Sequence, residues 1–180
     1  MSVTIKYFVH GTTIDNEEGK ATGWSHGKLS QKGIEQAKEL RKKINLDEVD
    51  LVITSDLERA KESANYIFKK EKEILNDSRI RECCYGKLDE EDKILVNYEE
   101  HIIEPFPQGE TLKDVEYRVE EFCKYLLEKY DGKTVALVSH RAPQLALEVI
   151  TKGITWEEAI QNDWRNNKAW QPGWTYIINK

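Results

Sequence analysis

Short apolar strands that alternate with amphipathic helical segments are the feature that most constrains this fold. Runs of apolar and β-branched residues span 3–9, 50–54 and 134–139, and a similar run spans 174–178. Such runs, bounded by turn residues, predict buried strands, and the helical segments between them imply right-handed crossovers. The sequence therefore predicts an α/β fold, a three-layer α/β/α sandwich around a mainly parallel sheet.

The helical segments begin at recognisable capping residues. Ser30 precedes the first long helix, and either Ser55 or Asp56 is expected to cap the second. Thr111, with Asp114 three residues later, predicts a capping box at the start of the longest helix. The apolar positions of these three segments recur at helical spacing and are expected to face the core: Ala37, Leu40, Ala60, Ala64, Val115 and Val119.

Residues from about 76 to 109 break the alternation of strands and helices. They have no clean period and contain Gly86, Pro105 and Pro107. Long segments of this kind often cover a binding site. Because 180 residues is an ordinary size for one domain and no linker is apparent, we expect a single domain over 1–180 with a lid-like excursion at about 76–109.

Composition excludes several classes of protein. Hydrophobic residues make up 39% of the chain and charged residues 33%, which favours a folded domain over disorder. The net charge of -6 argues against general binding to nucleic acids or anionic membranes. No apolar run reaches membrane-spanning length and the first residues lack a signal-peptide pattern, so we expect a cytoplasmic protein.

Two histidines lie where predicted strands end. His10 follows the first strand and His140 the third, and ligands of open α/β sheets bind beyond the carboxyl ends of strands. The turn after His10 contains donors that can surround a tetrahedral phosphate. Arg59, just after the second strand, offers a planar fork for two phosphate oxygens. Taken singly, these residues are equally compatible with an ordinary turn histidine and a solvated helix arginine.

Five ordered motifs together resemble the histidine phosphatase superfamily, also called phosphoglycerate mutase-like. The first is Phe8-Val9-His10-Gly11-Thr12-Thr13 with Asn16, followed by Thr22-Gly23-Trp24 and Lys28-Leu29-Ser30. The others are Ser55-Asp56-Leu57 with Arg59-Ala60 and Ser63-Ala64, Arg81 to Gly86, Gly109-Glu110-Thr111, and Val135 to His140. The resemblance extends over nearly the whole chain and implies the fold of that family.

The resemblance also implies roles for individual residues. His10 would attack phosphorus and form a phosphohistidine, which divides one difficult displacement into two easier ones. Glu82 would protonate the leaving alkoxide and then deprotonate the attacking water. Arg59 and His140 would hold the phosphoryl oxygens, Thr13 and Asn16 would add neutral hydrogen bonds, and Trp24 would line the substrate entrance.

One position departs from the family pattern. The resembling family has arginine immediately before the nucleophilic histidine, whereas this chain has Val9 there, by substitution or by deletion of one strand residue. A charge-assisted contact of this kind contributes about 1.5–3 kcal/mol. Arg141, directly after His140, is expected to reach into the vacated space, and Arg79 or Lys87 is the next candidate if it does not.

The function predicted from these features is hydrolysis of a phosphomonoester of a small metabolite. The enzyme would be a metal-independent phosphatase of the histidine acid phosphatase type, without a cofactor, and its partner a small-molecule phosphate ester rather than nucleic acid or a membrane. A phosphoglycerate mutase is one alternative. The other is a phospho-ligand binding protein that is catalytically weak or inactive. The sequence does not specify the oligomeric state.

Overall fold

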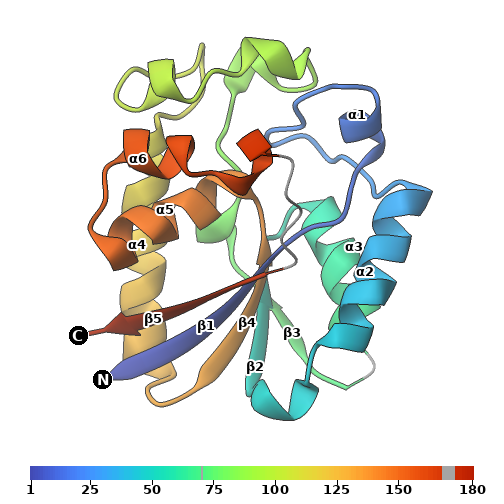
Figure 1. Cartoon of the computed structure of the whole chain (residues 1–180), viewed down its shortest axis with the longest axis vertical. Coiled ribbons are helices and arrows are strands. Elements are labelled where there is room, and N and C mark those ends of the chain that lie inside the picture. The colour runs from blue at the N-terminus through green and yellow to red at the C-terminus, as the bar shows by residue number, and fades with distance from the viewer. Residues whose placement is uncertain (70, 168–172) are drawn as a thin grey trace.

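Five strands form one sheet in the spatial order β3-β2-β4-β1-β5. The structure is a computed structural model, and it describes residues 1–69, 71–167 and 173–180 (Figure 1). The first four strands pair in parallel, whereas β5 runs antiparallel to β1. The strands are β1 (Ser2–Val9), β2 (Leu51–Thr54), β3 (Ile74–Asn76), β4 (Thr134–Ser139) and β5 (Trp174–Asn179). The mainly parallel sheet is therefore confirmed, although the three-residue edge strand β3 was not predicted.

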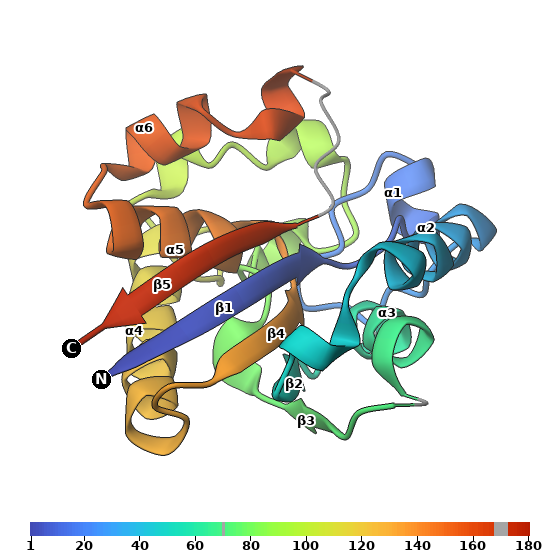
Figure 2. The same ribbon diagram turned by 60° about the horizontal axis from the view of Figure 1, so that its bottom comes forward.

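Helices cover both faces of this sheet (Figures 1 and 2). On one face lie α2 and α3, and on the other α4 and α5, which confirms the three-layer arrangement. The short helices α1 and α6 lie outside these layers. The bounds are α1 (Ile14–Glu17), α2 (Gln31–Lys43), α3 (Glu58–Phe68), α4 (Leu112–Lys129), α5 (Arg141–Lys152) and α6 (Trp156–Gln161).

Alternating side chains of β1 explain why the sheet has two hydrophobic cores. Tyr7 belongs to the larger core beneath α4 and α5, and its neighbour Phe8 to the smaller core beneath α2 and α3. Successive residues of a strand point to opposite faces, so one apolar run supplies both cores. The predicted inward positions of α2, α3 and α4 are buried as expected: Ala37, Leu40, Ala60, Ala64, Val115 and Val119.

Helix caps follow the sequence prediction in two of three cases. The Ser30 hydroxyl accepts from the N–H of Gly33, and Thr111 forms a capping box with Asp114. The prediction for α3 was wrong, because its N-cap is Leu57 and no side chain caps it. The carboxylate of Asp56 instead binds the guanidinium of Arg81 through two hydrogen bonds of 2.7 and 2.5 Å. A bidentate ion pair is stronger than a single bond to a backbone N–H.

The excursion at about 76–109 consists of loops and short 3-10 turns. Its turns span Ser78–Ile80, Gly86–Leu88, Lys93–Leu95 and Glu99–His101. In Figure 1 the segment lies above the carboxyl ends of the parallel strands. Ile80, Tyr98 and Phe106 are buried in the larger core and fix it there. Its action as a lid remains a prediction.

The connections that follow β1 and β4 lie on opposite faces of the sheet. The chain leaves β1 toward α2 on one face and leaves β4 toward α5 on the other (Figure 2). The crossovers therefore separate at this point and leave a crevice beyond the two carboxyl ends, which is where open α/β sheets bind ligands.

The close approach of α2 to the turn after β1 generates a prediction. A Cβ atom added to Gly33 would lie 2.0 Å from the carbonyl oxygen of Thr12. Gly33→Ala is therefore expected to lower the free energy of unfolding, measured by urea denaturation, by about 1–3 kcal/mol. Lys32→Ala, at an exposed neighbouring position, is the control and should change it by less than about 0.5 kcal/mol. Equal stability of the two variants would contradict a rigid contact here.

Candidate active site

Parallel pairing of β1 with β4 brings the two predicted histidines together. Val9 lies opposite Ser139 in the register, and the next backbone N–H, that of His10, donates to the Ser139 carbonyl at 3.0 Å. The ring centroids of His10 and His140 are consequently 5.1 Å apart. The two residues meet because neighbouring parallel strands end at the same edge of the sheet.

Hydrogen bonding defines which nitrogen of His10 carries the proton. Nδ1 lies 2.7 Å from the carbonyl oxygen of Gly11, which can only accept, so Nδ1 is the donor. Nε2 then has a lone pair, and it accepts from Nε–H of Arg59 at 3.3 Å. Burial and the charge of Arg59 lower the pKa of His10 to about 3. The imidazole is therefore neutral at physiological pH, with its lone pair on Nε2.

Arg59 connects His10 to the loop that precedes α2. Only 1% of the residue is exposed, and its terminal nitrogens donate to the carbonyls of Gly23 at 2.7 Å and Ser25 at 3.0 Å. A guanidinium has five N–H groups, so two remain for a ligand. The residue both fixes the loop and presents positive charge beside Nε2 of His10.

The turn after His10 is less available to a ligand than its sequence suggests. The N–H of Gly11 donates to the Ser63 hydroxyl, and that of Thr12 donates to the Gln36 side chain. Thr13 is buried and forms a capping box with Asn16 at the start of α1. Because these three backbone donors are already bonded, phosphate contacts at this edge have to come from side chains.

Glu82 is buried and receives four hydrogen bonds. Oε1 accepts from the N–H groups of Cys83 and Ala142, both at 2.9 Å, and from the Tyr98 hydroxyl at 3.3 Å. Oε2 accepts only from the N–H of Arg141 at 3.2 Å. Two of these donors belong to the first turn of α5, where the helix dipole favours negative charge. Oε2 keeps a lone pair for proton exchange.

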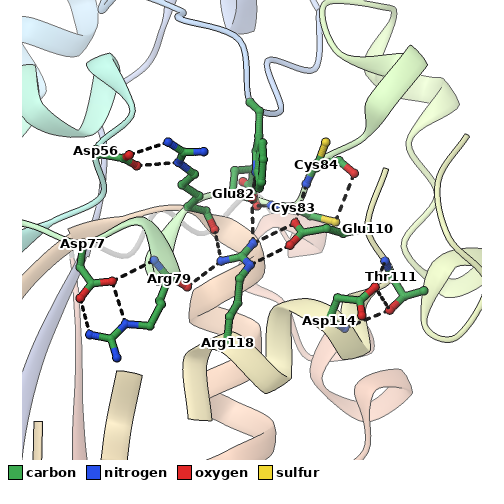
Figure 3. A network of polar contacts seen from close by, with 12 residues as sticks. Asp56, Asp77, Arg79, Glu82, Cys83, Cys84, Glu110, Thr111, Asp114 and Arg118 are labelled. Carbon is green, nitrogen blue, oxygen red and sulfur yellow. Dashed lines mark hydrogen bonds and ion pairs between the residues drawn. The ribbon is translucent and has the colours of Figure 1, made fainter. Parts of the chain in front are cut away.

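Arg118 of α4 fixes the backbone that carries Glu82 (Figure 3). Its guanidinium donates to the carbonyls of Arg79, Arg81 and Glu82 at 2.7–2.9 Å. On the other side it forms two bonds with the carboxylate of Glu110, at 2.9 and 3.1 Å. One arginine therefore connects the excursion to α4. The sequence analysis did not predict this role, because three of the partners of Arg118 are backbone carbonyls distant in the chain.

A cavity of about 410 Å³ opens at this edge of the sheet. His10, Glu82 and Asn16 line it, whereas Thr13, Trp24 and His140 do not. The cavity is positive although the chain has a net charge of -6, since the described residues that line it include five cationic ones and one acidic one, Glu82. The cationic residues that line it are Lys20, Arg59, Lys93, Arg141 and Arg165. Such a site attracts a small anion through local charge.

Besides Thr13, two predicted site residues lie beside the cavity rather than on its wall. His140 is fully buried next to His10, and neither of its ring nitrogens has a hydrogen-bond partner within residues 1–69, 71–167 and 173–180. Burial, followed by the charge of Arg59, lowers its pKa well below the ordinary value. The indole N–H of Trp24 donates to the Glu82 carbonyl at 2.7 Å, and the Arg81 guanidinium lies over its ring at 4.8 Å. Trp24 thus contacts the backbone of Glu82 rather than the cavity.

Arg141 lies on the Glu82 side of the cavity. Its guanidinium is 4.4 Å from the ring centroid of Tyr98, and its Nε donates to Asp163 at 2.7 Å. Arg79 is bonded to Asp77 and lies against aromatic rings of α4, outside the cavity lining. Lys87 does not line the cavity either. Of the three cations considered from sequence, Arg141 is the one at the site.

Arg165 and Asp163 were missed by the sequence analysis. They occupy the segment between α6 and β5, which has no motif and no clean period. Only the antiparallel return of β5 along β1 brings this segment to His10. These two residues can therefore be identified from the topology of the sheet but not from a local sequence motif.

No metal-binding group is evident in the parts of the chain that the structure describes. Groups of three or more His, Cys, Asp or Glu side chains suited to a metal ion do not occur among those residues. None of the described helices is both long and apolar enough to cross a membrane.

Known proteins resemble the chain over most of its length. The family model described as "Histidine phosphatase superfamily (branch 1)" matches residues 8–170. A 2,3-bisphosphoglycerate-dependent phosphoglycerate mutase of Bartonella tribocorum is 27% identical over 91% of this chain and 88% of its own. Phosphoserine phosphatase 1 of Hydrogenobacter thermophilus is 29% identical over 81% of this chain and 74% of its own. The solved structure of Bacillus stearothermophilus YhfR has a TM-score of 0.82 at 23% identity, covering 98% and 91% of the two chains.

The buried neutral histidines predict acid sensitivity of folding. The pKa of His140 is 6.5 in an unfolded chain and much lower in the folded one, so protons bind the unfolded state preferentially below pH 6.5. Stability should fall with pH below that value, by up to about 1.4 kcal/mol per pH unit for this group. Urea unfolding of the wild type and His140→Asn at pH 7, 6 and 5 tests this. The wild type should lose more stability than the variant, and identical pH slopes would contradict the prediction.

The Arg118 network predicts a large loss of stability when its guanidinium is removed. Arg118→Met removes the ion pair with Glu110, whose carboxylate keeps only the bond from the Cys84 N–H among the described residues. It also removes a donor from three carbonyls, of which that of Glu82 keeps the Trp24 indole N–H, and should lower the free energy of unfolding by about 3 kcal/mol. Arg41→Met removes an exposed ion pair with Glu71 and is the matched control, with an expected loss below about 1 kcal/mol. Urea denaturation measures both. A loss for Arg118→Met no greater than that of the control would show that the network is not stabilising.

Proposed function

Because the chain belongs to the histidine phosphatase superfamily, branch 1, we propose that it hydrolyses phosphomonoesters through a phosphohistidine at His10. The observation that carries this proposal is the state of His10, whose Nε2 lone pair lies in a positively charged cavity. The substrate would be a small phosphorylated metabolite that fits about 410 Å³.

In the first step, Nε2 of His10 attacks phosphorus and the bond to the ester oxygen breaks. The phosphoryl group has to enter between Nε2 and Arg59, whose Nε–H then turns from the imidazole to a phosphoryl oxygen. The low pKa of His10 keeps Nε2 unprotonated and ready to attack. His140, whose ring nitrogens have no partner among the described residues, would donate to another phosphoryl oxygen. Asn16 and Arg141 are further candidate contacts on the cavity wall.

Glu82 would move the proton in both steps. Its carboxylic acid gives a proton to the leaving alkoxide, and its carboxylate then takes one from the water that attacks the phosphohistidine. The second step releases inorganic phosphate and restores Glu82 and His10. Oε2 is the oxygen suited to this exchange, because three of the four donors bind Oε1.

The absence of an arginine before His10 belongs to the same proposal. Val9 lines the cavity and continues the regular register of β1 against β4, so an apolar side chain occupies this place. The site would then hold the phosphoryl group with one local guanidinium, that of Arg59, and any second one has to come from elsewhere in the fold.

A phosphoglycerate mutase remains the second candidate. The Bartonella mutase matches this chain over 88% of its own length. Length therefore does not separate the two activities. They differ in the acceptor of the phosphoryl group, which is water in a phosphatase and a second hydroxyl of the sugar acid in a mutase.

Loss of His10 is expected to abolish turnover of a generic aryl phosphate. His10→Ala removes the nucleophile, whereas His26→Ala, at an exposed position outside the cavity, should retain wild-type activity. Phosphate release is measured with chelator present, and the loss should be at least about 10³-fold. Intact mass spectrometry after brief exposure to substrate should show one added phosphoryl group on the wild type and none on His10→Ala.

Three outcomes discriminate the candidates. Release of inorganic phosphate from a panel of phosphomonoesters supports the phosphatase, and conversion of 3-phosphoglycerate to 2-phosphoglycerate without net release supports the mutase. An inactive wild type that still binds inorganic phosphate would leave the phospho-ligand binding protein. Equal activity of the wild type and His10→Ala would overturn the role of His10 in either enzyme.

A further inference from the structure

The antiparallel return of β5 brings a distant arginine to the end of β1. Trp174 pairs with Tyr7, so the chain that enters β5 lies beside the carboxyl end of β1, where His10 follows. Arg165, in the turn Trp164–Asn167 that precedes β5, lines the same cavity as His10. Its place in the site is set by the sheet and by no local motif.

One side of the Arg165 guanidinium is fixed by protein groups. Nη1 donates to Asp163 at 2.8 Å and lies 3.5 Å from the Gln144 side-chain oxygen, and the indole ring of Trp164 lies 4.6 Å from Cζ. The Asp163 side chain is fully buried and also binds Arg141. Burial alone would raise its pKa, but the charges of Arg165 and Arg141 hold that pKa below its ordinary value. Asp163 is therefore a charged anchor.

The other side of this guanidinium has no partner in the part of the chain that the structure describes. Nη2 of Arg165 is buried, and no hydrogen-bond partner for it exists among the residues described. A buried charged donor that lacks an acceptor is unfavourable by more than a neutral one, so the position favours a ligand that brings an acceptor. The charge of Arg165 also contributes, after burial and Arg59, to the lowered pKa of His10. Because Arg165 and His10 line the same cavity, the free donor is available to a ligand held on His10.

Arg141 and Arg165, both bound to Asp163, lie where they would contact different parts of a ligand. Arg141 lies over Tyr98, whose hydroxyl bonds Glu82, and so it flanks the group that handles the leaving oxygen. Arg165 follows Trp164, whose ring packs against Trp174 beside the end of β1, and it lines the cavity with His10, where the phosphoryl group would sit. Among the anions that fit, one with several strong acceptor oxygens at His10 matches a guanidinium donor best.

We propose that Arg165 is a phosphoryl-binding residue, whose Nη2–H donates to a non-bridging oxygen of a phosphomonoester positioned on His10. This inference rests on the proposed function and supplies the second guanidinium that the position of Val9 does not. Asp163 holds the side chain in place, so little conformational entropy is lost when the ligand binds.

Binding of inorganic phosphate, measured by isothermal titration calorimetry, tests the proposal without depending on turnover. Arg165→Met should weaken phosphate binding about ten- to a hundredfold. Arg165→Lys keeps the charge but loses the planar fork, in which one terminal nitrogen binds Asp163 and the other is free for the phosphate, so its affinity should fall between those of the wild type and Arg165→Met. Arg41→Met, at an exposed ion pair on α2, should bind phosphate as the wild type does.

Thermal unfolding is recorded for every variant, so that a folding defect is recognised. If Arg165→Met does not fold, Arg165→Lys decides, and wild-type phosphate affinity in a folded Arg165 variant overturns the proposal. A change confined to the KM of esters with an additional carboxylate, with phosphate affinity intact, also overturns it and assigns Arg165 to the leaving group. Failure of the proposed function is seen separately, as absent turnover and absent phosphohistidine in a wild type that still binds phosphate.

Discussion

Pairing of β1 with β4 in parallel register is the interaction on which the candidate site depends. It places His10 and His140 at adjacent strand ends, although they are far apart in the chain. The same pair of strands marks the point where the crossovers go to opposite faces, so the crevice and the two imidazoles coincide. The remaining groups reach this point from α3, the excursion, the start of α5 and the segment before β5.

The charged and titratable side chains at this point are stabilised by groups elsewhere in the fold. The histidines stay neutral because burial and Arg59 disfavour their protonation, which preserves the Nε2 lone pair of His10. The cations, in turn, are held by groups outside the ligand space: loop carbonyls hold Arg59, and Asp163 holds Arg141 and Arg165. A cavity with excess positive charge can therefore persist in a protein whose net charge is -6.

The position of Glu82 shows how a polar network stabilises a loop. The excursion contains only short 3-10 turns among its described residues, and Arg118 donates to three of its carbonyls (Figure 3). The first turn of α5 then holds the carboxylate through the N–H groups of Arg141 and Ala142. Two separate elements thus determine where a single side chain lies.

The sequence by itself determined the α/β class, the strands that end at His10 and His140, and the caps at Ser30 and Thr111. These features depend on local periodicity and on side-chain bonds to nearby backbone. Only the tertiary structure decided that Asp56 pairs with Arg81 rather than capping α3, and that Arg165 joins the cavity. The reason is physical: a charged side chain has several possible partners, and the packing of distant segments decides which of them comes within reach.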